Sequence, residues 1–302
     1  MPRSFFLALL TISIFFSACQ TKQASLSHSI QKNCEYYSLK SAQCKDIEQM
    51  VNQLEPYKVI FIGDHHSEDS LHQKTAELIM ALSLSGTKVK LANEWFYPSD
   101  NQTLHEYVSK DINETEFIEK IQWKKRLKYY KFDSFRPMYQ AIQKTYGKLY
   151  GINLSKEERK KISDQNISAM NEDERRFNTN LDINVSAHKN MLKPFFSHCH
   201  APKPKETLQE CTERMYKVQV AWDSKMALES YKLSKGLQEN EKLIVFAGAL
   251  HIQNDLGIPL RFARLSNLPY VSIIPAEQTI QHIKHGLADF LMFYKEKNIS
   301  KD

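Results

Sequence analysis

The sequence predicts an α/β protein in which a mostly parallel sheet of about five strands is flanked by helices and carries an inserted helical sub-domain. Three observations support this fold class. Short apolar runs recur along the chain, amphipathic helical patterns lie between them, and one long polar segment has no strand pattern. The chain has 302 residues, 42% hydrophobic and 25% charged, which suits a globular protein with one large domain.

The predicted strands are short, almost continuous apolar runs, as expected where helices cover both faces of a sheet. These runs occupy residues 58–63, 88–94, 148–153, 242–248 and 270–274. Between them, segments 68–85 and 134–146 carry apolar residues at the three- and four-residue spacing of a helix face. The apolar residues are Leu71, Leu78, Ile79 and Leu82 in the first segment, and Phe135, Met138, Ile142 and Tyr146 in the second.

The helical sub-domain is predicted for residues 154–238, between the third and fourth strands. It opens with Ser155-Lys-Glu-Glu158, a capping box that starts a helix. Prolines 194, 202 and 204 interrupt the helical pattern once, and a last helix over 205–237 leads back to the sheet. The two halves of the α/β domain are therefore residues 34–153 and 239–302.

The first residues have the pattern of an export signal. Arg3 precedes an apolar run over 5–18, which is shorter than the roughly 20 residues that span a bilayer. The run ends in Phe16-Ser-Ala-Cys19, which favours a bacterial lipoprotein signal over residues 1–18, with an ordinary cleaved signal as the alternative. Cys19 would then be lipidated, residues 19–33 would form a polar tether, and acyl chains would hold the protein in the cell envelope. Gln20 favours delivery to the outer membrane, by analogy with lipoprotein sorting.

Four other cysteines remain, and export into an oxidising compartment predicts disulfides for an even number. Of three connectivities we favour the local one, Cys34 with Cys44 and Cys199 with Cys211. A zinc site made by His198-Cys-His200 with Cys211 is the alternative, although the spacing fits no standard zinc finger.

The chain is basic, with a formal net charge of +6. No nucleic-acid-binding motif accompanies these residues, so they predict a solvated, lysine-rich surface rather than a nucleic-acid partner.

Polar, chemically active side chains follow three of the predicted strands. They lie in Gly63-Asp-His-His66, in Asn93-Glu94, and in Gly248-Ala-Leu-His251, so that Gly-x-x-His occurs twice directly after a strand. In open α/β sheets, sites form at the carboxyl ends of the strands. His66, His251 and Glu94 therefore predict a metal-binding or acid–base cluster, with Asp64 as a further ligand or base. The alternative is that these histidines only satisfy backbone groups at the strand ends.

The motifs together resemble the ChaN family of bacterial haem-binding, iron-regulated lipoproteins. The resemblance is carried by the two Gly-x-x-His motifs, by Asn93-Glu-Trp-Phe96 and by the segment Leu256-Gly-Ile-Pro259. It implies a parallel sheet with a smaller helical domain, haem as ligand, a homodimer linked by haem, and an outer-membrane haem receptor as partner. The wider superfamily includes erythromycin-esterase-like and Tiki-like metal-dependent hydrolases.

Further motifs also match, in the same order along the chain: Arg136-Pro137 and Gln219-x-x-x-Asp223. At three positions the chain departs from the family pattern, with Asp64 in place of Glu, Phe135 in place of Tyr and Trp222 in place of Arg. The family is expected to hold haem iron through a tyrosine, so Phe135 leaves the identity of that ligand open.

A ferric haem needs an axial ligand, cations for its propionates and aromatic walls, and a phenolate suits ferric iron. Segment 120–131 supplies six basic residues, one Trp and two adjacent Tyr. Tyr130 or Tyr129 is the predicted iron ligand, with Tyr139 and Tyr150 in reserve. Lys131, Arg136 and His72 are the candidates for contacts with the propionates. The plainer interpretations are a helix with a solvated basic face, and an exposed histidine at position 72.

Two functions therefore remain possible, besides an enzyme-like scaffold whose site has lost its activity. The first is a membrane-anchored haem-binding lipoprotein that takes part in haem or iron uptake without turnover. The second is a hydrolase that uses a divalent metal held by His66, Glu94 and His251.

Overall fold

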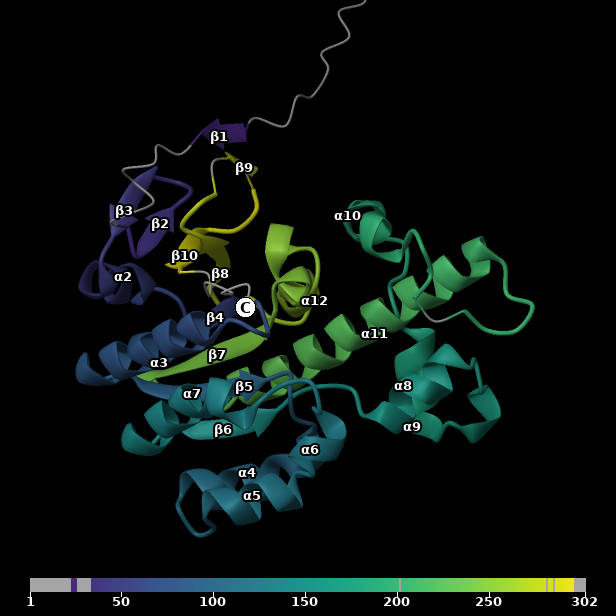
Figure 1. The fold of residues 1–302 in the computed structure, drawn as a ribbon, viewed down its shortest axis with the longest axis horizontal. Helices are drawn as coiled ribbons and strands as arrows, with labels where there is room; N and C mark the ends of the chain where they lie inside the picture. The colour runs from purple at the N-terminus through teal and green to yellow at the C-terminus, as the bar shows by residue number, and fades with distance from the viewer. Residues whose placement is uncertain (1–22, 26–33, 201, 281, 285, 296–302) are drawn as a thin grey trace, which may run out of the picture.

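The structure is a computed structural model, and it describes residues 23–25, 34–200, 202–280, 282–284 and 286–295. Its centre is an eight-stranded mixed sheet with strand order β3-β2-β10-β8-β4-β7-β5-β6 (Figure 1). The six strands from β10 to β6 run parallel, and β2 and β3 add antiparallel strands at one edge. The strands are β2 (Tyr36–Ser38), β3 (Gln43–Lys45), β4 (Val59–Asp64), β5 (Lys88–Asn93), β6 (Lys148–Gly151), β7 (Glu241–Gly248), β8 (Tyr270–Glu277) and β10 (Phe290–Tyr294).

All five strands that the sequence predicts are present, as β4, β5, β6, β7 and β8. The predicted α/β class with a mostly parallel sheet is confirmed. Beyond the prediction, the structure adds β2, β3 and β10 to the sheet. It also has a separate two-stranded sheet made by β1 (Gln23–Ser25) and β9 (His282–Lys284), so a part of the predicted tether is a strand.

Helices cover both faces of the parallel strands because the strand side chains alternate between two apolar cores. Ile60, Ile62 and Phe246 point into a core shared with α3 and α7. Phe61 and Val245 point to the opposite face, where α11 and α12 cover them. The helices of this part are α2 (Ile47–Leu54), α3 (Asp69–Leu84), α4 (Asn101–Val108), α5 (Glu114–Lys120), α6 (Trp123–Arg126), α7 (Phe132–Lys144) and α12 (Ile258–Ala263).

The segment between β6 and β7 is helical, with no strand among its described residues. Its helices are α8 (Lys156–Ser163), α9 (Glu172–Thr179), α10 (Ser186–Phe196) and α11 (Leu208–Ser234). The predicted capping box is present, since Ser155 accepts a hydrogen bond from the backbone N–H of Glu158. These helices enclose a small apolar core of their own, and α11, which is 27 residues long, runs from this core to the sheet (Figure 1).

Both predicted disulfides are present. Cys34 pairs with Cys44 across 5.3 Å between their Cα atoms, and Cys199 pairs with Cys211 across 5.9 Å. The alternative zinc site is therefore wrong, because the two thiols it needs are bonded to each other. Cys19 lies outside the described residues. Among the residues described, no helix has the length and apolar character needed to cross a bilayer.

Candidate functional site

The three polar strand ends meet at one rim because their strands are neighbours in the parallel sheet. β7 lies between β4 and β5, with Asp64 of β4 opposite Gly248 of β7 and Asn93 of β5 opposite Phe246. The two Gly-x-x-His motifs therefore leave the sheet side by side, and Glu94 follows on the other side of β7. The structure brings together the residues that the sequence placed in one cluster.

Glu94 connects the two histidines of this cluster. Its Oε1 lies 3.4 Å from Nε2 of His66, and its Oε2 lies 3.8 Å from Nε2 of His251. The backbone N–H of Gly248 donates to Oε2 at 2.9 Å and fixes the carboxylate. Only 6% of Glu94 is exposed, so this charge faces the two imidazoles rather than bulk water.

Asp64 orients His66 through the ring nitrogen that does not face Glu94. Its Oδ2 lies 2.8 Å from Nδ1 of His66, and its Oδ1 lies 2.9 Å from Nε2 of His72. His72 is completely buried, and its other nitrogen lies 2.8 Å from Oγ of Ser134. Both ring nitrogens of His72 thus have partners inside the protein, and neither is open to a ligand. The plainer interpretation of His72 as an exposed histidine is wrong.

Asp223 of α11 orients His251 through its Nδ1 atom, as Asp64 orients His66. Its Oδ1 lies 2.5 Å from Nδ1 of His251, and Nε2 of Gln219, from the same motif, lies 2.9 Å from that nitrogen. Two residues that sequence analysis missed complete this group: His188 of α10, 3.3 Å from Oδ2 of Asp223, and Arg261 of α12, 3.8 Å from the same oxygen. Both lie on helices of otherwise ordinary composition, so no strand-end signal marks them.

Two opposing effects set the pKa of both cluster histidines. Burial by itself would lower the pKa of His66, but its bond to Asp64 and the charge of Glu94 outweigh burial and raise that pKa above the usual value. Burial also opposes the charged form of His251, and Asp223 and Glu94 likewise raise its pKa. For Asp64 the bonds to His66 and His72 overcome burial and lower the pKa. The cluster therefore stabilises imidazolium next to carboxylate.

A cleft of about 530 Å³ opens over this cluster. Its aromatic walls are Trp95, Tyr97, Tyr130 and Trp222, and the ring centroid of Trp95 lies 4.5 Å from that of His66. Basic residues lie along its rim: Lys125, Arg126, Lys156 and Arg159. Arg126 is paired with Asp100, and Arg159 lies over the ring of Trp222 at 5.3 Å. The cleft thus combines apolar aromatic surface with positive charge.

A second hollow, of about 560 Å³, adjoins the cleft at His66 and Tyr130. Tyr129 and Lys131 line it, and Tyr129 is 81% exposed. Tyr130 packs against Trp95 at 4.8 Å, and burial together with the charges of Glu94 and Asp64 raises its pKa. The two adjacent tyrosines therefore differ: one ring is a wall of the cleft, and the other is open to solvent.

The remaining predicted haem residues lie elsewhere. Arg136, a predicted propionate contact, pairs instead with Glu114 at 2.6 Å and with Asp133, and lines neither the cleft nor the second hollow. Tyr139 is fully buried, and Tyr150 stacks edge-on against His105, half-buried beside β5. Neither reserve tyrosine lines the cleft or the second hollow.

His66, Glu94 and His251 do not form a compact group of metal-ligand atoms. Among the described residues, the one group of three His, Cys, Asp or Glu side chains whose ligand atoms all lie within 4.8 Å of one another is Cys199, Glu206 and Cys211. Its two cysteines form a disulfide. The arrangement of His66, Glu94 and His251 therefore gives no support to the hydrolase hypothesis with a divalent metal.

Comparison with known proteins gives a family and a fold. The family model described as "Haem-binding uptake, Tiki superfamily, ChaN" matches residues 50–262. No curated protein sequence gives a significant match.

Among solved structures, ChaN of Campylobacter jejuni with cofacially bound haem is similar, with a TM-score of 0.66 and 19% identity over 86% of this chain and 96% of that one. The type III effector HopBA1 has a TM-score of 0.50 and 15% identity, over 83% of this chain and 93% of its own. A mutant of the erythromycin esterase EreC, in its open conformation, has a TM-score of 0.47 and 12% identity, over 80% of this chain and 77% of its own.

Proposed function

Because the chain belongs to the ChaN family of haem-binding uptake proteins, we propose that it captures haem at the cell envelope and holds the iron through a tyrosine. Family membership supports haem binding in uptake. The tyrosine ligand of the iron, the lipid anchor in the membrane and the homodimer linked by haem are our proposal. The observation that carries the proposal is the pair Tyr129 and Tyr130 at the junction of the aromatic cleft and the second hollow.

The residues around the two tyrosines fit the needs of haem. A porphyrin needs flat apolar surface, which Trp95, Trp222 and the ring of Tyr130 offer. Its propionates need cations, which Lys125 and Lys131 offer on the two sides of Tyr130. Ferric iron supplies the positive charge that lets a bound tyrosine lose its proton.

We assign the bond to the haem iron to Tyr129, and we assign Tyr130 to the aromatic wall of the cleft. Tyr129 is 81% exposed, so iron can approach its phenol without moving other groups. Tyr130 is half-buried against Trp95 and His66, and burial together with the nearby carboxylates raises its pKa, which disfavours its phenolate. An open ligand on the surface also suits a haem that is shared between two copies of the chain, a proposal that the cofacial haem of the Campylobacter jejuni structure supports.

Substitution of each tyrosine by phenylalanine tests this assignment. Tyr129→Phe is expected to abolish the high-spin tyrosinate spectrum on addition of hemin and to weaken binding at least about tenfold, or about 1.4 kcal/mol. Tyr146→Phe is a matched control, because Tyr146 is 91% exposed and lies on neither hollow. The readouts are absorption spectra and sedimentation with and without hemin. Loss of the spectrum in Tyr130→Phe alone would contradict the assignment, and a protein that ignores hemin would refute haem binding.

We further propose that Cys19 carries the lipid anchor and that the protein faces an outer-membrane haem receptor. The support is the sequence Phe16-Ser-Ala-Cys19, which has the small residues that precede a lipidated cysteine. A Cys19→Ala variant is expected to leave the membrane fraction, because one residue carries the acyl chains. Unchanged sedimentation with membranes, measured by immunoblotting of fractions, would contradict the anchor.

A further inference from the structure

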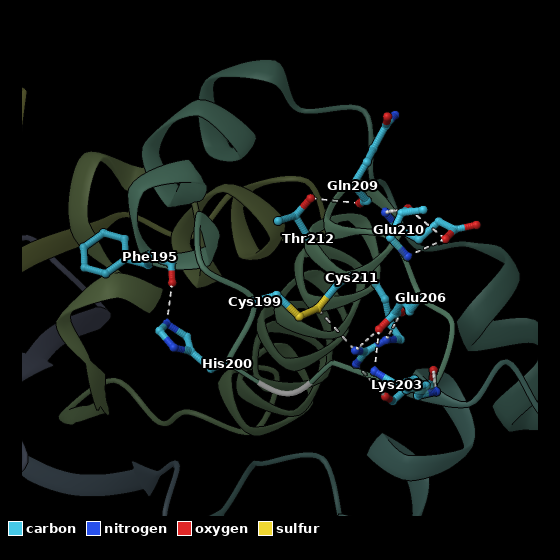
Figure 2. Close-up of a disulfide and its surroundings, with 12 residues drawn as sticks. Phe195, Cys199, His200, Lys203, Glu206, Gln209, Glu210, Cys211 and Thr212 are labelled. Atoms are coloured by element: carbon cyan, nitrogen blue, oxygen red, sulfur yellow. Dashed lines mark hydrogen bonds and ion pairs between the residues drawn. A yellow bond between two sulfur atoms is a disulfide. The ribbon is translucent and has the colours of Figure 1, made fainter.

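The Cys199–Cys211 disulfide joins two helices of the helical segment. Cys199 follows the end of α10, and Cys211 lies in the first turn of α11 (Figure 2). The two residues differ in access, since Cys199 is 9% exposed and Cys211 is 1% exposed. Cys199 also has a φ of +44°, a left-handed conformation that costs a residue with a Cβ atom roughly 1 kcal/mol or more. The bond therefore closes a loop with a strained backbone, and one of its cysteines lies nearer to solvent.

A guanidinium group lies next to one sulfur of the pair. Nη2 of Arg214 lies 3.5 Å from Sγ of Cys211. Glu206 fixes Arg214 with two hydrogen bonds, at 2.6 Å to Nε and 2.7 Å to Nη2, and the Arg214 side chain is 9% exposed. An oxygen of Glu206 lies within 4.8 Å of both sulfurs alike, so Arg214 is the charge that distinguishes Cys211 from Cys199. A fixed cation in contact with a sulfur favours its thiolate, and a favoured thiolate leaves a disulfide faster. Access thus favours attack at Cys199, and charge favours departure of Cys211.

We propose that Cys199–Cys211 is a thiol-exchange site, attacked at Cys199 by a dithiol reductant, and that its opening releases α10 and withdraws His188 from Asp223. This goes beyond haem binding, and it does not depend on the haem assignment.

The exchange is balanced as follows. A thiolate of the dithiol attacks Sγ of Cys199, the Cys199–Cys211 bond breaks, and Cys211 leaves as a thiolate next to Arg214. The second thiolate of the reductant then attacks its own sulfur in the mixed disulfide and releases Cys199. The protein gains two electrons and, in all, two protons, and the dithiol is oxidised to a disulfide.

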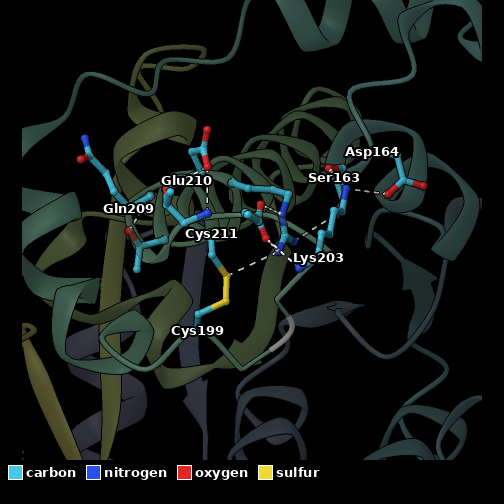
Figure 3. Close-up of polar contacts among 11 residues, drawn as sticks. Ser163, Asp164, Cys199, Lys203, Gln209, Glu210 and Cys211 are labelled. Carbon is cyan, nitrogen blue, oxygen red and sulfur yellow. Dashed lines mark hydrogen bonds and ion pairs between the residues drawn. A yellow bond between two sulfur atoms is a disulfide. The ribbon is translucent and has the colours of Figure 1, made fainter.

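The contacts around the disulfide indicate which of the two helices loses its restraint when the bond opens. On the α11 side, Nζ of Lys203 donates to the backbone oxygen of Ser163 at 2.6 Å and to Asp164 at 2.8 Å, which ties the loop to the end of α8 (Figure 3). On the α10 side, His200 bonds locally, with Nε2 2.7 Å from the backbone oxygen of Phe195, and points away from the sulfurs (Figure 2). After the bond opens, α10 is held only by non-covalent contacts, among them the hydrogen bond from the Tyr216 hydroxyl to the backbone oxygen of Val185 at 3.3 Å and the packing of Leu192. We therefore expect α10, rather than α11, to be the side that loosens.

Loosening of α10 reaches the cleft through a buried contact. His188 is completely buried, and its Nε2 lies 3.3 Å from Oδ2 of Asp223, yet neither atom makes a hydrogen bond. Arg261 of α12 lies 3.4 Å from Nδ1 of His188 and 3.8 Å from Oδ2 of Asp223, so the contact depends on the position of α10 against both α11 and α12. Asp223 in turn holds Nδ1 of His251. The redox state of the disulfide thereby sets the surroundings of one cluster histidine.

The chemistry is tested on the full chain in two parallel reactions, one with glutathione and one with dithiothreitol. Both are followed by alkylation and mass spectrometry, and the glutathione reaction shows which cysteine is attacked. We expect the glutathione adduct on Cys199 and the free thiol on Cys211. Arg214→Gln is expected to slow opening of this bond about tenfold and to leave Cys34–Cys44 unaffected as an internal reference. Arg264→Gln, at a 50% exposed arginine paired with Asp182, is the matched control. An adduct on Cys211, or equal rates in the two variants, would overturn the proposal.

The structural consequence is tested by hydrogen exchange and by histidine NMR on the same samples. On reduction, amides of α10 are expected to exchange at least about tenfold faster, while those of 216–234 in α11 stay protected. Burial now lowers the pKa of His188 to about 4, against the charge of Asp223 and with a contribution from Arg261 and His251. In the reduced protein this pKa is expected to rise towards the usual value. An unchanged α10, or equal loss of protection throughout α8–α11, would refute release of α10. A Cys211→Ser variant gives the same readouts without a reductant.

Discussion

The Asp223→Ala variant is expected to lose about 4 kcal/mol of unfolding free energy. The carboxylate is fully buried and faces His251 at 2.5 Å, His188 at 3.3 Å and the guanidinium of Arg261 at 3.8 Å. Its removal leaves a buried arginine without its negative partner and an imidazole without the acceptor for its Nδ1–H. Uncompensated buried charge is among the few causes of losses as large as this.

Urea unfolding of the two proteins measures the loss. Asp182→Ala is the matched control, because Asp182 also pairs with an arginine, Arg264, but is 38% exposed. The control is expected to lose less than about 1 kcal/mol, since solvent screens exposed pairs. A similar small loss in both variants would show that the Asp223 network contributes no more than a surface ion pair.

The Gly257→Ala variant is also expected to be strongly destabilised, by about 4 kcal/mol. A Cβ atom at this position would lie 2.6 Å from the carbonyl carbon of His251 and closer still to its oxygen. These are backbone atoms, which cannot move aside as the end of a flexible side chain can. The loop that carries His251 would have to shift, so the cluster is expected to be disturbed together with the stability.

Gly236→Ala provides the comparison for this substitution. A Cβ atom there meets only the backbone oxygen of Leu233, at 4.0 Å, so the change is expected to be neutral or stabilising by up to about 1 kcal/mol. Thermal unfolding gives the stability of both variants, and the NMR signal of His251 reports on the loop. Equal melting temperatures for the two alanine variants would contradict the close backbone approach at Gly257.

The parallel core of the fold was predictable from the sequence, and the sheet edge was not. β4 and β7 are apolar runs bounded by turns, with glycine at or near their ends, which identifies buried strands. β2 and β3 are three residues each, too short for any periodicity to show. β10 is the apolar run Phe290–Tyr294, and five apolar residues alone do not distinguish a strand from a buried helical turn.

The candidate site was predictable to the extent that its residues follow strands. His66, Glu94 and His251 share this position, and neighbouring parallel strands must end at the same rim. His188 and Arg261 reach the cluster only because α10 and α12 pack against α11. Packing of this kind depends on tertiary contacts that no local spacing encodes. The same holds for the difference between Tyr129 and Tyr130, which are neighbours in the sequence but not in exposure.

If the proposed lipid on Cys19 is present, the pairing of β1 with β9 would limit how far the protein can stand from a bilayer. Gln23 of β1 pairs with Lys284 of β9 in the antiparallel register. If Cys19 carries acyl chains, about four residues separate it from β1, and these can span at most about 14 Å when fully extended. So short a connection would keep the β1–β9 sheet near the lipid headgroups and would restrict rotation of the protein relative to the bilayer. The lipid would then orient the protein as well as retain it.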